Sequence, residues 1–249
     1  MIISHESGQK DAPCVVFVHG AGMAGWMWKK QVDSVSSLRT ITVDLPDHGL
    51  DRTTPFMSIE SVADELAALI SECCPVGKAR LVGHSLGARV VLETLVRHPS
   101  CAASAVVSSA LVRPSPLVAM MNSHALNGLS LWMLRNDWLA RNQAKSFKFP
   151  DPDMTEHYLA DIRLMRTENL DRPINAFASR LCLPQGLDAI ACPVLVTAGS
   201  REAPSMLDSA KDIQNAIAGA KLEILDDADH TYPWSDFEAY NRLLESWLR

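Results

Sequence analysis

Ser85 is the residue of this chain whose neighbours most clearly favour chemistry. It stands in Gly83-His84-Ser85-Leu86-Gly87, after the apolar run 79–82 and before an amphipathic segment at 88–98. A serine on a tight strand-to-helix turn suits a nucleophile, because backbone strain lifts its hydroxyl clear of the sheet. Glycine is needed on both sides, since a side chain at either position would clash with neighbouring backbone. The pattern predicts nucleophilic catalysis by Ser85.

A serine hydroxyl needs a general base within hydrogen-bond reach, and His230 is the expected base. Of the eight histidines, it lies in the loop that follows the predicted strand 221–225 and precedes the final helix. Loops at the carboxyl ends of parallel strands converge on one edge of a sheet, which is where ligand sites form. Ser85 and His230 should therefore meet at that edge.

The base needs a carboxylate to fix its tautomer, and Glu202 is the leading candidate. It follows the predicted strand 194–197 in Gly199-Ser200-Arg201-Glu202, so it should reach the same edge. The alternative interpretation of Glu202 is a surface partner for Arg201. Three weaker candidates for the acid lie in the loop of the base: Asp229, which is adjacent to it, Asp226 and Asp227. A fourth, Asp208, is expected to lie in the helix that follows Glu202.

Two backbone amides are expected to form an oxyanion hole, the donors that face the negative oxygen of a tetrahedral intermediate. Leu86 follows the nucleophile at a helix start. Ala21 lies in the small-residue loop 19–23 after the first core strand, where the backbone can approach a substrate. Because both groups are main-chain amides, the side chains at 21 and 86 should matter mainly through shape.

Short apolar runs alternate with longer helical patterns and indicate the scaffold that positions these groups. The last helix is predicted to open with a capping box formed by Ser235 and Glu238. Buried strands separated by helices predict an α/β fold: a mainly parallel central sheet of about seven or eight strands, flanked by helices. The predicted strands are 15–18, 39–43, 81–82, 105–107, 194–197 and 222–225.

The region 112–187 interrupts this alternation, with helical patterning and several prolines but no convincing strand. We interpret it as a helical cap inserted between core strands, which leaves 1–111 and 188–249 as the core. Cap and core residues are expected to bound a substrate pocket, although apolar residues at this spacing are also common in plain core packing. The pocket candidates are Met23, Trp28, Met121 and Trp132.

Composition excludes several classes of protein. The chain has 249 residues, 47% of them hydrophobic, and a formal net charge of −6, which argues against nucleic-acid binding. No run approaches the length of a membrane span, and the start carries no signal-peptide pattern. The six cysteines show no metal or redox spacing, so we expect reduced thiols in a cytoplasmic protein. No pattern indicates an oligomeric state.

Taken together, these motifs resemble the α/β-hydrolase superfamily over essentially the whole chain. The matching pieces are His19-Gly20, the turn 44–49, the serine motif 83–87, Gly199-x-x-Glu202, and His230 before a last helix. The order nucleophile, acid, base is that of the family. The chain departs from it in having Glu202 where Asp is usual, Asp47 where the turn usually has Gly, and room for only one early edge strand.

The resemblance implies a sheet of eight strands, a helical cap and cleavage of ester-like bonds. It also implies structural or loop-shaping roles for His19, His48 and His84. The main hypothesis is a serine hydrolase acting on a small or medium carboxylic ester, thioester or lactone, a small-molecule acyl substrate, with no metal or organic cofactor. The alternatives are a non-hydrolytic ligand-binding protein of this fold, or a carbon–carbon bond hydrolase, haloperoxidase-like enzyme or lyase.

Overall fold

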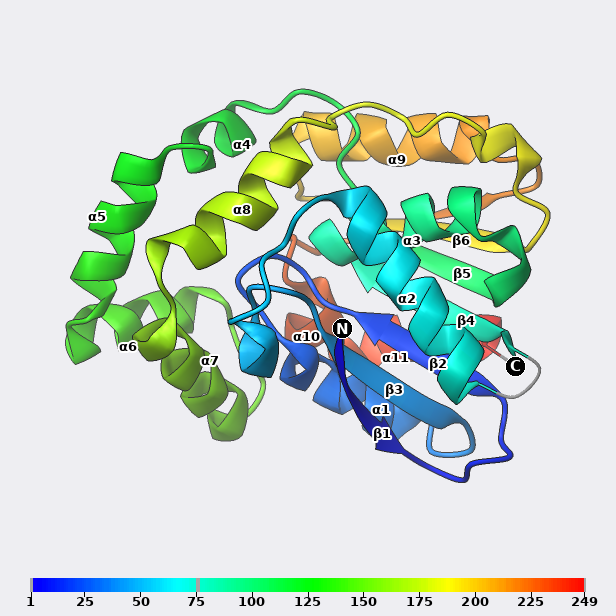
Figure 1. Ribbon diagram of the computed structural model, residues 1–249, viewed down its shortest axis with the longest axis horizontal. Coiled ribbons are helices and arrows are strands. Elements are labelled where there is room, and N and C mark those ends of the chain that lie inside the picture. Colours follow the sequence, from blue (N-terminus) through cyan, green and yellow to red (C-terminus); the bar gives the residue numbers. More distant parts are fainter. Residues whose placement is uncertain (1, 75–76, 249) are drawn as a thin grey trace.

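The computed structural model describes residues 2–74 and 77–248, and its centre is a seven-stranded sheet (Figure 1). The spatial order is β1-β3-β2-β4-β5-β6-β7, and every neighbouring pair is parallel except β1 with β3. The α/β prediction is therefore confirmed, with seven strands and a single early edge strand. The strands are β1 (Ile3–Ser7), β2 (Cys14–Val18), β3 (Arg39–Asp44), β4 (Ala79–His84), β5 (Ala102–Ser108), β6 (Val194–Gly199) and β7 (Lys221–Leu225).

Helices cover both faces of this sheet (Figure 1). Alternate residues of β2 divide between two apolar clusters, because successive strand side chains point to opposite faces. Helices α2 (Ile59–Cys73), α3 (Leu86–Arg97) and α9 (Pro204–Ala216) supply the cluster that contains Val16. The opposite cluster, around Phe17, includes α11 (Phe237–Trp247), against which α1 (Lys29–Ser34) packs.

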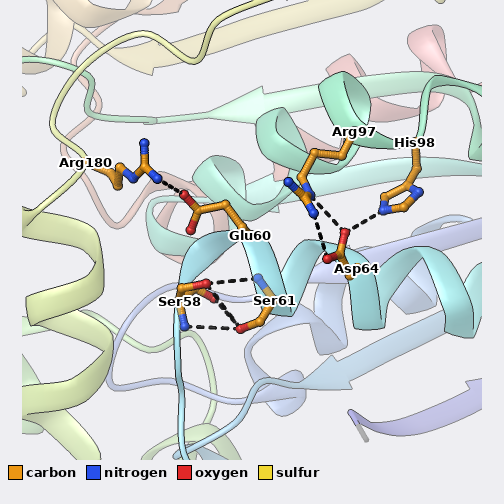
Figure 2. A network of polar contacts seen from close by, with 7 residues as sticks. All are labelled: Ser58, Glu60, Ser61, Asp64, Arg97, His98 and Arg180. Atoms are coloured by element: carbon orange, nitrogen blue, oxygen red, sulfur yellow. Dashed lines mark hydrogen bonds and ion pairs between the residues drawn. The ribbon is translucent and has the colours of Figure 1, made fainter.

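Helix α2 shows how local sequence sets an element boundary. Ser58 lies at its N-terminus, and its hydroxyl accepts a hydrogen bond from the Ser61 amide while the Ser61 hydroxyl accepts one from the Ser58 amide (Figure 2). Farther along α2, Asp64 accepts two hydrogen bonds from Arg97 and contacts His98 at the end of α3. These contacts hold α2 and α3 in register on the same face.

The predicted capping box at the last helix is wrong. Ser235 is instead the final residue of a short helix, α10 (Tyr232–Ser235), and Asp236 lies at the N-terminus of α11 without a side-chain capping bond. The hydroxyl of Ser235 accepts a hydrogen bond from Thr231, at 2.9 Å. After β7 the chain forms two helices and not one, because the residues that follow His230 form α10 before α11 begins.

Between β5 and β6 the chain forms five helices, and 112–187 contains no strand, all of it among the described residues. We call them the inserted helices, and they lie beside the sheet in green to yellow in Figure 1. Polar contacts join them to loops that follow β2, β3 and β7, so they cover the carboxyl-terminal edge of the sheet. They are α4 (Pro116–Met121), α5 (His124–Leu134), α6 (Asp137–Ser146), α7 (Pro152–Leu164) and α8 (Thr167–Ala178).

No helix in the described ranges combines the length and apolar character that crossing a bilayer requires.

Candidate active site

Ser85 lies on the turn between β4 and α3 with a backbone conformation that side chains rarely adopt, φ 53° and ψ −114°. Its amide donates to the Ser108 carbonyl at 2.9 Å, which extends the sheet pairing into the turn. A Cβ on Gly83 would lie 2.5 Å from the Gly87 oxygen, and one on Gly87 would lie 2.2 Å from the Val18 oxygen. The predicted need for glycine at both positions is confirmed.

His230 and Glu202 meet at the carboxyl ends of β7 and β6. The His230 Nδ1 lies 2.7 Å from Glu202 Oε1, and this contact leaves Nε2 as the other ring nitrogen for proton transfer. The Glu202 side chain is 2% exposed, whereas that of His230 is 44% exposed. A buried carboxylate therefore orients a solvent-accessible imidazole.

The Glu202 carboxylate is only partly satisfied while His230 is neutral. Its Oε1 also accepts a hydrogen bond from Ser109 at 2.8 Å, but its buried Oε2 has no hydrogen-bond partner among the described residues. Oε1 thus makes both contacts of the carboxylate, one with Ser109 and one with His230 Nδ1.

Three of the four competing acids are engaged elsewhere. Asp229 accepts hydrogen bonds from Thr231 and Lys148; burial raises its pKa, but these contacts outweigh burial and lower it to about 2. Arg201, the alternative partner of Glu202, pairs with Asp227 instead. Asp208 lies on α9 and pairs with Arg113.

His84, the neighbour of Ser85, brings the end of β4 against His230. Its ring centroid lies 4.7 Å from that of His230. Burial and the nearby charge of His230 hold the pKa of His84 well below its usual value, so this ring stays neutral. Within residues 2–74 and 77–248, no hydrogen bond joins Ser85 Oγ to His230. Such contacts are often long in unliganded enzymes and tighten when substrate binds.

The loop after β2 lies directly against the nucleophile. A Cβ on Gly20 would meet both the Ser85 Cβ and the His84 ring at 3.3 Å. Ala21 follows immediately in this loop, and Leu86 is the first residue of α3. The two expected oxyanion donors therefore flank Ser85 from different elements.

A buried hydroxyl network behind Glu202 was missed by sequence reasoning. The Tyr232 hydroxyl lies 2.7 Å from Thr197 Oγ1 and 3.3 Å from Ser109 Oγ. Ser108 links Thr197 to Tyr240, at 2.9 and 2.7 Å. Ser109 follows β5 at the same sheet edge as the acid and the base, so the strand-end rule could have found it had it been applied to hydroxyls as well as acids.

The four pocket candidates occupy different environments. Trp28 is fully buried between Phe17 and Tyr240, where its role is core packing. Trp132 is 73% exposed on α5, and Met121 is 38% exposed at the end of α4. Met23 is buried in the loop beside Ser85, in the apolar cluster that also contains residues of the inserted helices. None of these positions tests contact with a substrate, so the pocket assignment of all four residues stays a prediction.

No group of three or more metal-ligating side chains occurs in the part of the chain that the structure describes.

Comparison with known proteins identifies the family. The model of the alpha/beta hydrolase family matches residues 15–243, nearly the whole chain. The chain belongs to this family. It is 24% identical over 269 residues to a protein of Caulobacter sp. (strain K31) named putative carbamate hydrolase RutD, a match that covers 98% of this chain and 93% of that protein.

Two other similarities differ in extent: one covers part of the chain, and the other is a likeness of fold over the whole chain. The chain is 34% identical over 116 residues to Arabidopsis thaliana protein PHYLLO, chloroplastic, but these residues are 42% of this chain and only 7% of that much longer protein. It superposes on a thermophilic esterase from Thermogutta terrifontis with a TM-score of 0.76 and 22% identity, covering 100% of this chain and 93% of the esterase. At that identity the likeness is one of fold.

Proposed function

We propose that this protein is a serine hydrolase that cleaves a small or medium carboxylic ester, thioester or lactone through an acyl-enzyme. The observation that carries the proposal is the 2.7 Å contact between His230 and buried Glu202, next to a strained Ser85 turn. Three residues far apart in sequence bring an imidazole, a carboxylate and a hydroxyl to one sheet edge. That set of groups is the requirement of acyl transfer by a serine nucleophile.

In this proposal Ser85 Oγ attacks the substrate carbonyl as His230 Nε2 takes its proton. The Nδ1–H of His230 donates to Glu202 Oε1, which holds the ring in the tautomer that leaves Nε2 free to accept. The imidazolium then protonates the leaving alcohol, thiol or lactone oxygen. In the second half of the cycle His230 activates water, and hydrolysis of the acyl-enzyme returns Ser85 to its free form.

The amides of Ala21 and Leu86 are assigned to the developing oxyanion. Gly20 lies against Ser85, so the loop can present the next amide to the reacting carbon. Preorganised amide donors at such a site contribute roughly 3–4 kcal/mol each to transition-state stabilisation. In this proposal Met23 and Met121 are apolar contacts to the substrate.

The decisive experiment is labelling by a fluorophosphonate, which reacts with an activated serine. We expect one label per chain, located on Ser85, and none in Ser85→Ala. The matched control is Ser130→Ala, because Ser130 is an exposed serine on α5 and its loss should leave labelling unchanged. Hydrolysis of acyl esters of graded length should fall by a factor on the order of 10⁶ in kcat for Ser85→Ala. Turnover by Ser85→Ala close to that of the original protein would contradict the mechanism.

A further inference from the structure

Asp47 occupies a backbone position that normally favours glycine. It follows β3, at φ 68°, and its side chain is completely buried. A non-glycine residue at positive φ carries strain, which persists only where the surroundings compensate for it. Its amide donates to the carbonyls of Asp51 and Thr54 at 3.1 and 2.9 Å, so the turn itself is well bonded. Compensation for the strained backbone must also come from the contacts of the buried carboxylate.

The Asp47 carboxylate accepts four hydrogen bonds, three of them from helix α8. Arg172 binds it with two nitrogens, Nε at 2.8 Å and Nη2 at the other oxygen. The Asn169 amide donates to it at 2.8 Å, and the Phe56 backbone amide donates at 2.8 Å. A bidentate arginine–carboxylate pair fixes orientation as well as distance.

Asn169 extends the same junction to both sides. It is 3% exposed, and its side-chain nitrogen also donates to the Arg52 carbonyl at 2.8 Å. Its oxygen accepts the Arg166 amide at 2.9 Å, at the start of α8. The first two turns of α8 are therefore joined to the chain between β3 and α2 through the buried side chains of Asp47 and Asn169, and through Arg172, whose side chain is 38% exposed.

The turn that holds α8 also supports the loop beside the nucleophile. The Leu45 amide donates to His19 Nε2 at 3.0 Å, and His19 Nδ1 in turn donates to the Gly20 carbonyl at 2.8 Å. Gly20 lies against Ser85, because a Cβ added to Gly20 would lie 3.3 Å from the Ser85 Cβ. A continuous set of contacts thus runs from α8 through the turn at Asp47 to the loop of the assigned oxyanion donor.

We propose that Asp47 is a positioning residue that holds α8, and with it the inserted helices, in place over the substrate site next to Ser85. This inference rests on the function proposed for Ser85. Asp47 touches neither substrate nor reacting atoms; it acts through Arg172 and Asn169. This role explains why Asp47 stands where glycine is expected, because its carboxylate binds Arg172 and Asn169 of α8 and glycine has no side chain to do so.

The test compares Asp47→Gly, which relieves the strained backbone and removes the carboxylate, with Arg172→Gln, which removes the same pair from the other side. We expect KM for a p-nitrophenyl ester with an eight-carbon acyl chain to rise roughly tenfold in each. KM for the acetate ester should change less, and kcat should stay within about twofold. Because the two substitutions break one junction, the double variant should resemble either single variant.

The matched control is Arg180→Gln. Arg180 follows α8 and pairs with Glu60 of α2, so it also joins the two parts, but its side chain is 59% exposed (Figure 2). Exposed pairs contribute little, so KM should be unchanged. Hydrogen exchange of the α8 amides gives a readout independent of activity, and it should speed up at least tenfold in both junction variants but not in the control.

The outcomes separate the two proposals. Unchanged α8 exchange in Asp47→Gly and Arg172→Gln would overturn the junction. Faster exchange with unchanged KM would reduce Asp47 to a structural role and overturn its positioning role. Absence of fluorophosphonate labelling in the original protein would overturn the catalytic proposal instead, while the exchange result would still report on the junction.

Discussion

His230 Nδ1 lies 2.7 Å from the Glu202 carboxylate, although the two residues are 28 positions apart and come from different loops. The contact depends on a close approach of these loops: a Cβ on Gly199 would lie 2.3 Å from the Ala228 oxygen. The Arg201 amide also donates to Ala228, at 2.9 Å. The ends of β6 and β7 are therefore built as one unit that carries acid and base together.

Glu202→Gln should lower kcat by a factor of roughly 10⁴, less than the loss expected for Ser85→Ala. The amide keeps the shape of the side chain but removes the charge that stabilises imidazolium on His230. The measurement is kcat for ester hydrolysis, with thermal unfolding to verify the fold. The matched controls are Asp208→Asn and Asp227→Asn; if either abolished activity while Glu202→Gln did not, the assignment of the acid would be wrong.

Gly199→Ala should disturb the pairing of acid and base without touching either side chain. The added methyl would force the backbone at Ala228 away, which displaces His230 relative to Glu202. We expect kcat to fall by about 100-fold, the scale of effect that a displacement near 1 Å produces. Gly128→Ala is the control, since the nearest heavy atom to its Cβ would lie 3.6 Å away. Equal activity in the two variants would contradict the packing argument.

The sequence was sufficient for the sheet and for the contact between His230 and Glu202, because each follows a simple local rule. The nucleophile needs glycines around a tight turn, and the acid and base need only follow parallel strands. These rules predicted every parallel strand, and they brought His230 to Glu202 as expected. Pairing of Ser85 with His230 stays a prediction of the proposed mechanism.

What the sequence did not predict depends on packing between distant segments. Trp28 and Trp132 are the same residue type at similar helical spacings, yet one is fully buried and the other 73% exposed. The turn at Asp47 had no local explanation either, since three of the four hydrogen bonds to its carboxylate come from α8, more than 120 positions away. Ser235 failed as a helix cap because it is the last residue of α10, and Asp236 lies at the N-terminus of α11.

Stability should fall as the pH drops below about 6.5, because histidines are buried in neutral form. Burial lowers the pKa of His48 from 6.5 to about 3, and it also lowers those of His19 and His84. Below pH 6.5 these histidines bind protons in the unfolded chain but stay neutral in the folded chain. Unfolding therefore becomes more favourable as the pH falls towards 3. His48 should contribute a slope that approaches about 1.4 kcal/mol per pH unit in that window, and His19 and His84 act in the same direction.

The measurement is the free energy of unfolding by urea between pH 7.5 and pH 5. His48→Gln should flatten the slope by about one proton, because glutamine can still donate to the Pro46 carbonyl but does not titrate. The control is Asn142→Gln, at an exposed and non-titrating residue of α6, which should leave the slope unchanged. A pH-independent free energy over this range would contradict the neutral assignment of the buried rings.

Oxidation should join Cys14 to Cys74. All six cysteines are free thiols, but the sulfurs of these two lie 2.8 Å apart, where β2 begins and α2 ends. Diamide would take one hydrogen from each thiol and leave a disulfide that spans 60 positions.

Closing a loop of that length lowers the entropy of the unfolded chain, a stabilisation of about 4 kcal/mol. Tm after oxidation should rise by roughly 10 °C, and peptide mass mapping should find the cross-link. Cys182→Ser, on an exposed thiol, should retain the shift and Cys14→Ser should lose it; a shift that survives Cys14→Ser would place the bond elsewhere.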